Sequence, residues 1–409
     1  MTERYPSPQD DVVVAGGGPA GTAAAITLAR LGRRVTIVDK ATFPRDKCCG
    51  DGLTAAALRR VEHLGLNPRT VASWEPVEDV MVVTASGRPV HLPLPRRSGG
   101  LFAVSARRSD LDAALLGRAR ESGVRVIEGR GVTGVTASAY GVDVEVDSGA
   151  RLTAGYLVAA DGMWSPIRRC LGLTPPGYLG EWRAGRQYLA GTGPEARKLW
   201  VWFEPDMLPG YAWSFPLPGG MVNFGYGVVK GTHPAFKGQR IDWRDRPHIR
   251  DVLGPDTYEA GPWRAWPIPA RIGDAALSGL GGRVLFAGDA AGACDPMTGE
   301  GIAQALETGE AAARAIAQAG PDRPDQAAAR YERIIAWGLA LDDRLSQLLS
   351  AILARPTGSD RALAIVEKSG WGRRHFARWM FEDTPRAVLA TPQRWHRRML
   401  RQAGAYEHR

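Results

Sequence analysis

The start of the chain shows short apolar runs interrupted by glycine. Asp11-Val-Val-Val-Ala15 ends in three glycines, which is typical of a buried parallel strand. Residues 19–31 are rich in alanine and leucine with helical spacing, and Gly32 follows them as a helix C-cap does. A second apolar run over 34–39 predicts another strand, so the segment forms a β-α-β unit of about thirty residues.

Helical and strand patterns alternate further along the chain. Helical periodicity returns over residues 109–122. The runs after it predict four strands, near 124–128, 132–137, 142–147 and 151–159. A buried strand is then predicted over 283–288, and an alanine-rich helix over 299–318.

The character of the sequence changes between the predicted strands at 151–159 and 283–288. From about 186 to 270, alternating aromatic-rich segments are separated by proline and glycine, which is the pattern of an antiparallel sheet. We expect this sheet to form a separate substrate domain. Past Pro321 the pattern is helical to the end of the chain, with breaks at Pro356, Pro385 and Pro392.

The predicted fold class is therefore α/β, with a discontinuous Rossmann-type domain, an inserted antiparallel β-sheet substrate domain and a C-terminal helical region. The predicted limits are 1–75, 100–185 and 271–325 for the Rossmann-type domain, 76–99 and 186–270 for the substrate domain, and 326–409 for the helical region.

The composition is that of an ordinary globular protein, with 44% apolar and 23% charged residues in a chain of 409. No apolar run reaches the roughly eighteen residues that a membrane-spanning helix needs, and the polar N-terminus lacks the apolar centre of a secretory signal. The four cysteines form no metal-ligand or disulfide framework. These features favour a reducing, cytoplasmic location.

Positive charge is concentrated at the C-terminus. The net charge is +9, and residues 371–409 hold nine arginines against Glu382, Asp383 and Glu407, with aromatic residues between them. Such a stretch either forms solvated helices that cover the core or contacts the anionic inner face of a membrane. No nucleic-acid-binding motif accompanies it, so we expect no nucleic-acid partner.

Three glycine or acid motifs carry the cofactor prediction. The first is Gly16-x-Gly18-x-x-Gly21, between the predicted strand and helix. Glycines here allow a tight turn and a close approach to a pyrophosphate, whose charge the helix N-terminus stabilises. Asp39 ends the second strand, where a carboxylate accepts hydrogen bonds from a ribose. This arrangement predicts a bound dinucleotide.

The other two motifs indicate which dinucleotide. Asp161-Gly162 and Gly288-Asp289 each follow a predicted buried strand. In FAD proteins similar to para-hydroxybenzoate hydroxylase, the second acid holds the ribityl chain. The first pairing borders the nucleotide pocket and is also available for NAD(P)H binding. Arg108 matches an arginine that these proteins place near the cofactor. A turn or a helix-end charge explains each feature alone, but their order along the chain favours FAD.

The segment Pro296-Met-Thr-Gly299-Glu300-Gly301-Ile302 precedes the alanine-rich helix. Backbone N–H groups at such a helix start can face the pyrimidine edge of a flavin. The positive end of the helix dipole there stabilises the anionic reduced form. A capping turn that contacts no ligand is the alternative.

Three stretches carry a family resemblance: Pro44-Arg-Asp-Lys-Cys-Cys49-Gly50-Asp51-Gly52-Leu-Thr54, Pro209-Gly-Tyr211-Ala-Trp213-Ser-Phe215-Pro216, and the Gly-Glu-Gly-Ile run. With them, roughly residues 10–310 resemble the geranylgeranyl reductase family, flavoproteins that saturate isoprenoid carbon–carbon double bonds. Aromatic hydroxylases usually carry a different last run, and the Trp-x-Trp-x-Ile-Pro segment of flavin halogenases is matched less well.

Tyr211, Trp213 and Phe215 alternate along a predicted strand and therefore share one face. Together with Trp202 and Phe224, they are available to wall a hydrophobic slot for an apolar substrate beside the flavin. The alternative is that this face is ordinary core between domains.

Cys49 matches the cysteine of the family's Cys-Gly motif, which lies near the flavin. A thiol there can protonate a substrate carbon after hydride has arrived at its neighbour. A small buried filler is the alternative role for a free cysteine. Cys49, Tyr211 and Trp213 are the candidate catalytic residues, and no metal is expected.

Twenty residues are assigned to the cofactor: Gly16, Gly18, Pro19, Ala20, Gly21, Asp39, Lys40, Cys49, Gly50, Asp51, Arg108, Val132, Asp161, Gly162, Gly288, Asp289, Pro296, Gly299, Gly301 and Ile302. The resemblance implies reduction of a geranylgeranyl- or polyprenyl-like alkene by reduced FAD, with NAD(P)H or a redox protein as electron donor. A flavin-dependent monooxygenase or halogenase of a secondary metabolite is the alternative. A flavin-bound scaffold without catalysis is a third.

Overall fold

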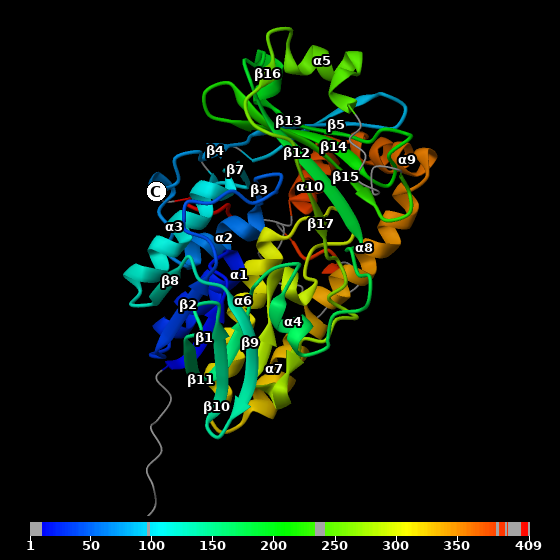
Figure 1. The fold of residues 1–409 in the computed structure, drawn as a ribbon. Helices are drawn as coiled ribbons and strands as arrows, with labels where there is room; N and C mark the ends of the chain where they lie inside the picture. Colours follow the sequence, from blue (N-terminus) through cyan, green and yellow to red (C-terminus); the bar gives the residue numbers. More distant parts are fainter. Residues whose placement is uncertain are drawn as a thin grey trace, which may run out of the picture.

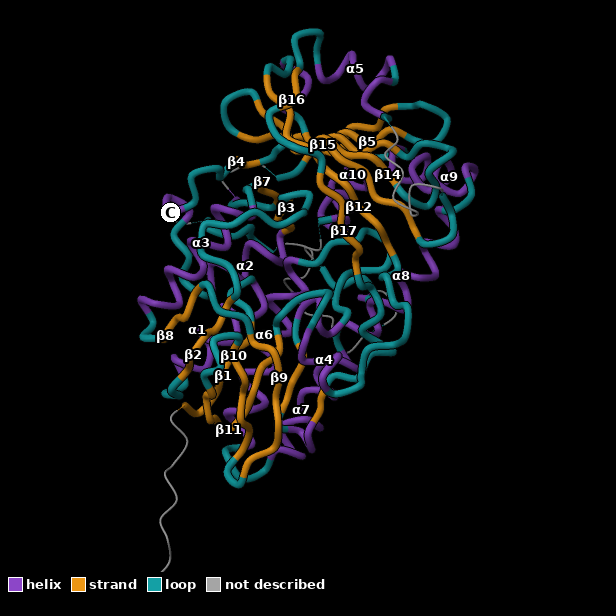
Figure 2. The backbone as a smooth tube through the Cα atoms, in the orientation of Figure 1, coloured by secondary structure: helices purple, strands orange, loops and turns teal. Residues whose placement is uncertain are grey.

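The structure is a computed structural model that describes residues 10–95, 99–233, 242–381, 384–388, 391 and 402–407. A unit built on parallel strands lies at one end of the molecule and an antiparallel sheet at the other (Figure 1). Helices and loops fill the zone between the two groups of strands (Figure 2).

The first sheet is mostly parallel. Its eight strands run in the order β18-β19-β11-β1-β2-β8, with β9 and β10 as an antiparallel hairpin beside β11. Strand β1 (Asp10–Ala15) pairs in parallel with β2 (Val35–Asp39) and β11 (Arg151–Ala159), and its residues 12–14 are fully buried. The other strands are β8 (Arg125–Glu128), β9 (Val132–Ser138), β10 (Gly141–Val146), β18 (Ser278–Gly279) and β19 (Val284–Phe286).

Helix α1 (Pro19–Arg30) packs closely against α6 (Ile302–Ala319). The approach depends on Gly309, because a methyl group at this position would overlap the carbonyl oxygen of Ala20. The other helices of this half are α2 (Ala55–His63), α3 (Arg108–Glu121), α4 (Pro166–Cys170) and α7 (Pro324–Trp337).

The second sheet has the strand order β16-β12-β15-β14-β13-β5-β6, with β17 paired to β12. Its bounds are β5 (Asp79–Val83), β6 (Pro89–Pro93), β12 (Trp182–Ala190), β13 (Leu199–Trp202), β14 (Tyr211–Leu217), β15 (Met221–Val229), β16 (Tyr258–Glu259) and β17 (Arg264–Ile268). The pairings are antiparallel except for β13 with β5. Helix α5 (Pro247–Leu253) packs beside it, and β3 (Gly52–Thr54), β4 (Glu75–Pro76) and β7 (Ala103–Ser105) form a small separate sheet.

Helices α8 (Leu339–Leu353) and α9 (Pro356–Glu367) lie along one side of the molecule, and α10 (Gly370–Met380) lies further in, beside the second sheet (Figure 1). Leu363 of α9 and Ala377 of α10 share a core with β5 and β13 of the second sheet. The C-terminal helices therefore cover one face of the antiparallel sheet.

The predicted α/β fold class is confirmed, and two details are wrong. Helix α6 begins at Ile302 rather than at 299, because Gly299 has a φ of +69° and turns the chain first. Residues 402–407 are not helical, since Ala405 forms a β-bridge with Leu101. The predicted break at Pro392 lies outside the described residues, and the domain limits stay predictions.

No helix within the described part of the chain is both long and apolar enough to cross a bilayer. All four cysteines are free thiols.

We expect Gly309→Ala to lower the free energy of unfolding by about 1–3 kcal/mol, because α6 must move away from α1 to admit the methyl group. Urea unfolding followed by circular dichroism measures this change. Gly117→Ala is the matched control, since no atom lies within 4 Å of a Cβ built there, within α3. It should be neutral or slightly stabilising; equal destabilisation by both variants would contradict the packing argument.

Candidate functional site

The glycine turn after β1 lies in close contact with its surroundings. Gly16 has a φ of +103°, and a methyl group there would overlap the carbonyl oxygen of Ala160 at the end of β11. Gly21 lies against the carbonyl oxygen of Gly16, which lets α1 start directly beside the strand. The turn therefore leaves the N-terminus of α1 open toward the space between the two sheets.

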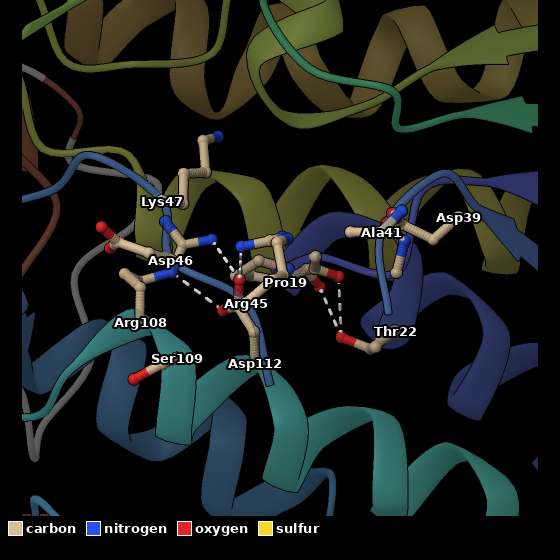
Figure 3. Close-up of polar contacts among 12 residues, drawn as sticks. Pro19, Thr22, Asp39, Ala41, Arg45, Asp46, Lys47, Arg108, Ser109 and Asp112 are labelled. Atoms are coloured by element: carbon tan, nitrogen blue, oxygen red, sulfur yellow. Dashed lines mark hydrogen bonds and ion pairs between the residues drawn. The ribbon is translucent and has the colours of Figure 1, made fainter. Parts of the chain in front are cut away.

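Two arginines stand over the start of α1. Nη2 of Arg45 and Nη2 of Arg108 lie 3.6 and 4.0 Å from the position that a Cβ of Gly18 would take. Asp112 holds both, accepting two bonds from Arg108 at 2.7 and 2.8 Å and lying 2.9 Å from Arg45 (Figure 3). Burial alone would raise the pKa of Asp112, but Arg108 and Arg45 together lower it. Fixed positive charge thus adds to the helix dipole at this position.

Asp39 is oriented by backbone groups at the end of β2. Its Oδ2 accepts a hydrogen bond from the N–H of Gly17 at 2.7 Å, and its Oδ1 accepts one from Ala41 at 2.8 Å. The carboxylate is therefore held beside the glycine turn, where a ribose would follow the pyrophosphate.

Asp289 comes directly after the last buried strand of the first sheet. Nζ of Lys47 donates to its Oδ2 at 2.7 Å. Burial would raise the pKa of Asp289, but the charge of Lys47 lowers it, so the carboxylate is ionised. The preceding N–H of Gly288 is bonded to Thr308 Oγ1 at 2.9 Å, which joins this turn to α6.

Asp161 has a carboxylate oxygen without a partner. Its Oδ2 accepts from Ser165 Oγ at 2.8 Å and from the N–H of Ile167 at 3.3 Å. Its Oδ1 is buried and accepts no hydrogen bond from any described residue. Burial raises the pKa of Asp161 to about 6. A donor on a ligand would satisfy this oxygen.

One cavity of about 830 Å³ connects these groups. The predicted cofactor residues that line it are Gly16, Gly18, Pro19, Ala20, Asp39, Lys40, Cys49, Gly50, Arg108, Val132, Asp161, Gly162, Gly288, Asp289, Gly299, Gly301 and Ile302. Gly21, Asp51 and Pro296 do not line it. The glycine turn, the arginine pair and the unsatisfied oxygen of Asp161 fit FAD, whose pyrophosphate would lie at Gly18.

The predicted aromatic wall faces the same cavity. Tyr211, Trp213 and Phe215 all line it, and neighbouring ring centres are 5.9 and 6.0 Å apart. The loop that carries Gly50 and Gly52 crosses this wall, and a Cβ at Gly52 would lie 3.0 Å from the ring of Phe215. The glycines of the Cys-Gly-Asp-Gly motif therefore let the loop lie directly on the aromatic rings.

Trp202 and Phe224 do not belong to this wall, so that prediction is wrong. Trp202 pairs with Ala212, and Phe224 pairs with Ser214, at positions that alternate with the wall residues. Side chains at alternate positions point to opposite faces of a sheet. Both aromatic residues pack in the core on the far face, together with Trp243.

Asn223 links the aromatic wall to the loop. Its Oδ1 accepts from Trp213 Nε1 at 3.1 Å, and its Nδ2 donates to Cys49 O and to Asp51 Oδ2, each at 2.8 Å. Asp51 is fully buried and has a φ of +65°, which is uncommon for a residue other than glycine. Its carboxylate also accepts from Tyr188.

Two candidate catalytic groups are uncharged. Burial raises the pKa of the Cys49 thiol and that of the Tyr211 hydroxyl, so both carry their proton at neutral pH. The hydroxyl group of Tyr211 donates a hydrogen bond to the carbonyl oxygen of Thr298, in the loop before α6. Cys49 and Tyr211 both line the cavity, and their roles as proton donors stay predictions.

The cavity continues into an apolar lobe beneath the C-terminal helices. Its walls combine strands β5, β13 and β14 with helices α8, α9 and α10, through Val82, Leu199, Val201, Phe203, Leu349, Ile352, Leu353, Leu363, Phe376 and Met380. Arg386 also lines it, and its guanidinium lies 3.8 Å from Asp295 in the loop before α6. This lobe suits a long apolar ligand.

The sequence analysis did not single out Arg45 or Asn223. Arg45 lies within the stretch that carries the family resemblance. Its positive charge there was a signal from which a contact to the cofactor phosphates could have been predicted. Asn223 offered no such signal, since its partners on the loop are 172 and 174 residues away in the sequence.

Comparisons with known proteins show the family to which the chain belongs. Residues 9–207 match the protein family described as FAD binding domain. The chain is 34% identical to a menaquinone reductase of Mycolicibacterium smegmatis, over 83% of this chain and 84% of that protein. It is 30% identical to digeranylgeranylglycerophospholipid reductase 1 of Methanopyrus kandleri, over 76% of this chain and 80% of that protein.

Solved structures share the fold. A geranylgeranyl bacteriochlorophyll reductase-like protein of Thermoplasma acidophilum superposes with a TM-score of 0.74, covering 94% of this chain and 99% of its own, at 20% identity. The halogenase PltM with a mutated residue, in complex with FAD, gives a TM-score of 0.70 over 94% of this chain and 84% of its own, at 16% identity. These likenesses concern the fold alone.

We expect Arg45→Ala to raise the dissociation constant for FAD about 10- to 100-fold, because a charge-assisted contact to phosphate is lost. Asp112 keeps its bonds to Arg108, so the fold should persist. Titration of the apoprotein with FAD, followed by flavin fluorescence, measures the change. Arg125→Ala removes an exposed arginine outside the cavity and should bind FAD like the wild type. Equal affinities in the three proteins would refute the assignment.

Proposed function

The chain belongs to the geranylgeranyl reductase family of FAD-dependent oxidoreductases, and on that premise we propose that it saturates a carbon–carbon double bond in the isoprenoid chain of a lipid. A prenylated quinone of the menaquinone type is the first candidate substrate, and an isoprenoid phospholipid is the second. Proteins named for these two substrates align with this chain over 84% and 80% of their own length.

The observation that carries the proposal is the continuity of the cavity. The dinucleotide cradle and the apolar lobe are parts of one space, and the aromatic wall lies between them. An isoprenoid chain is long, flexible and apolar, so burying it in such a lobe is favourable by about 25 cal/mol for each Å² removed from water. Neither a polar secondary metabolite nor a soluble cofactor needs a lobe of this kind.

The residues of the chain have separate tasks in this proposal. FAD, when bound, supplies the two-electron chemistry that delivers a hydride to the alkene. Arg45, Arg108 and Asp289 hold the cofactor, and Trp213 orients the alkene by apolar contact. Cys49, which is uncharged, donates a proton to the second carbon of the double bond. The lobe excludes water from the reacting carbons.

An anaerobic assay tests this function. The holoenzyme, reduced with dithionite, is mixed with a menaquinone or a digeranylgeranyl phospholipid, and the products are oxidised with ferricyanide before mass spectrometry. We expect a gain of two hydrogens that survives reoxidation, because a saturated side chain does not return to an alkene. A gain that reverts would indicate reduction of the quinone ring. Turnover only in air, with oxygen added to the product, would indicate a monooxygenase.

We expect Cys49→Ala to lower kcat for alkene reduction by about 100-fold, within the usual range for loss of a general acid. Binding of FAD and of substrate should change little, because the thiol is small. Single-turnover oxidation of the reduced flavin by substrate, followed at different pH values, measures the step. Cys170→Ala is the control, since Cys170 is exposed and does not line the cavity. Wild-type turnover in Cys49→Ala would remove the catalytic role of this residue.

We also propose that the outer face of α8 and α9 rests on a membrane. Leu348 and Ile365 are exposed large apolar residues on this face, and Ile352 is 47% exposed while it also lines the apolar lobe. An apolar surface that is continuous with the lobe would let a lipid tail enter without crossing water. Of the nine arginines in the basic stretch predicted to aid this contact, Arg373, Arg374, Arg378 and Arg386 are described, and the other five lie outside the described residues.

The double substitution Leu348→Ser and Ile365→Ser should weaken binding to vesicles of phosphatidylglycerol and phosphatidylcholine by at least tenfold, because two exposed apolar side chains are lost. Co-sedimentation measures the bound fraction. Leu31→Ser, directly after α1, removes a leucine that is 50% exposed and lies far from this face, and this variant should bind as the wild type does. Vesicle binding that does not distinguish these proteins would argue against this face as the contact.

A further inference from the structure

The cavity has a second, polar end that the proposed substrate does not use. We call it the polar mouth and define it by Asp46, Trp164, Arg186, Arg264 and Trp266, all of which line the cavity. Asp46 belongs to the loop after β2, and Trp164 to the loop after β11. The remaining three residues belong to β12 and β17 of the antiparallel sheet.

Arg186 is the informative residue of the polar mouth. Its side chain is only 1% exposed, and one of its nitrogens, Nη2, donates to Asp46. Its guanidinium also lies over the ring of Tyr188, 4.2 Å from the ring centre. Among the residues that the structure describes, none accepts a hydrogen bond from the buried Nε or Nη1. Buried N–H groups of a charged side chain are costly to leave unpaired, so these two donors indicate a ligand acceptor.

The phosphates of FAD already have other partners. The glycine turn faces Arg45 and Arg108, which Asp112 holds in place, whereas the partner of Arg186 is Asp46. Arg264 strengthens the second cluster, because its Nε lies 2.8 Å from Asp46 and half of its side chain is exposed. The polar mouth therefore offers two guanidinium groups around one carboxylate, with net positive charge.

The register of the sheet separates the polar mouth from the apolar lobe. Arg186 lies opposite Gly225, which lies opposite Trp213, which lies opposite Val201. Directly paired side chains share a face, and neighbouring strands are about 4.8 Å apart. Arg186 and Val201 are therefore about 14 Å apart along one face, with the aromatic wall between them. A lipid tail that fills the lobe leaves the polar mouth free.

Two tryptophans give the polar mouth an apolar edge. Trp164 and Trp266 are both exposed, with ring centres 6.3 Å apart and an interplanar angle of 73°. Trp266 lies two residues from Arg264 on β17, so the two side chains emerge from the same face of the strand. Exposed indole rings beside arginines suit a ligand that combines a planar ring with phosphate groups.

We propose that the polar mouth binds the nicotinamide dinucleotide that reduces the enzyme, with phosphate at Arg186 and Arg264 and a planar ring at Trp266. This inference rests on the proposed function, since each saturated double bond takes up a hydride and a proton. NAD(P)H supplies the hydride and leaves as NAD(P)⁺, and solvent supplies the proton. Reductant and substrate would thus occupy opposite ends of one cavity.

The first experiment measures binding to the FAD-loaded holoenzyme, without turnover. NADP⁺ and NAD⁺ are titrated by calorimetry, and tryptophan fluorescence is followed in parallel. We expect Arg264→Gln and Arg186→Met each to raise the dissociation constant about 10- to 100-fold, because a charge-assisted contact to phosphate is lost. Trp266→Ala should remove much of the fluorescence change. If Arg186→Met does not fold, the exposed Arg264 and Trp266 variants still decide the question.

Arg183→Gln is the matched control. It removes the same charge from the same strand. Arg183 is an odd number of residues from Arg186, so its side chain emerges from the opposite face of the strand, and it does not line the cavity. Its affinity for NADP⁺ should equal that of the wild type. Unchanged affinity in the Arg264 and Arg186 variants, or no binding of either nucleotide, would overturn the proposal.

Two further results separate this inference from the proposed function. Alkene reduction driven by dithionite in an enzyme that binds no nicotinamide nucleotide would overturn the polar mouth and leave the function standing. Nucleotide binding that depends on Arg264, without alkene reduction, would overturn the proposed function and leave the polar mouth standing. Geranylgeranyl diphosphate should not displace NADP⁺ from the wild-type enzyme. If it does, and Arg264→Gln abolishes the displacement, the polar mouth binds the diphosphate head group of a substrate instead.

Discussion

The buried carboxylate of Asp51 joins the two halves of the protein, and the site depends on this junction. Tyr188 and Asn223 of the antiparallel sheet donate to its Oδ2 at 2.7 and 2.8 Å, and the N–H of Arg108, which begins α3, donates to its Oδ1 at 3.2 Å. Burial raises the pKa of Asp51 to about 6, although these donors favour the ionised form. A residue with positive φ is thus held by contacts from both sides.

This junction explains how one loop serves both parts of the cavity. Arg45 and Lys47 precede Asp51 and point to the dinucleotide cradle, while Gly50 and Gly52 lie against the aromatic wall. Because Asp51 is anchored on the antiparallel sheet and on the start of α3, the cradle and the aromatic wall keep a fixed position relative to each other. The contacts of Asp51 therefore fix the loop that carries Cys49 relative to both the cradle and the aromatic wall.

The antiparallel sheet divides the cavity by its own geometry. Its inner face carries the apolar residues of β13 and β14 on one side, and the polar residues of β12 and β17 on the other. Gly225 lies between them and leaves room for the ring of Trp213, which a Cβ would meet. The period of two along each strand also explains why Trp202 and Phe224, although aromatic and near in sequence, lie in the opposite core.

The sequence by itself determined the features that depend on neighbouring residues. Gly16, Gly18 and Gly21 mark a turn that only small residues allow, and apolar periodicity predicted the strands and helices around it, so the α/β fold and the FAD cradle could be inferred. The tertiary structure decided which face each aromatic residue takes and how Asn223 reaches a loop 172 residues away. It also decided that no described residue accepts a hydrogen bond from two buried N–H groups of Arg186. These features arise from strand register and from packing between distant segments, which no local pattern encodes.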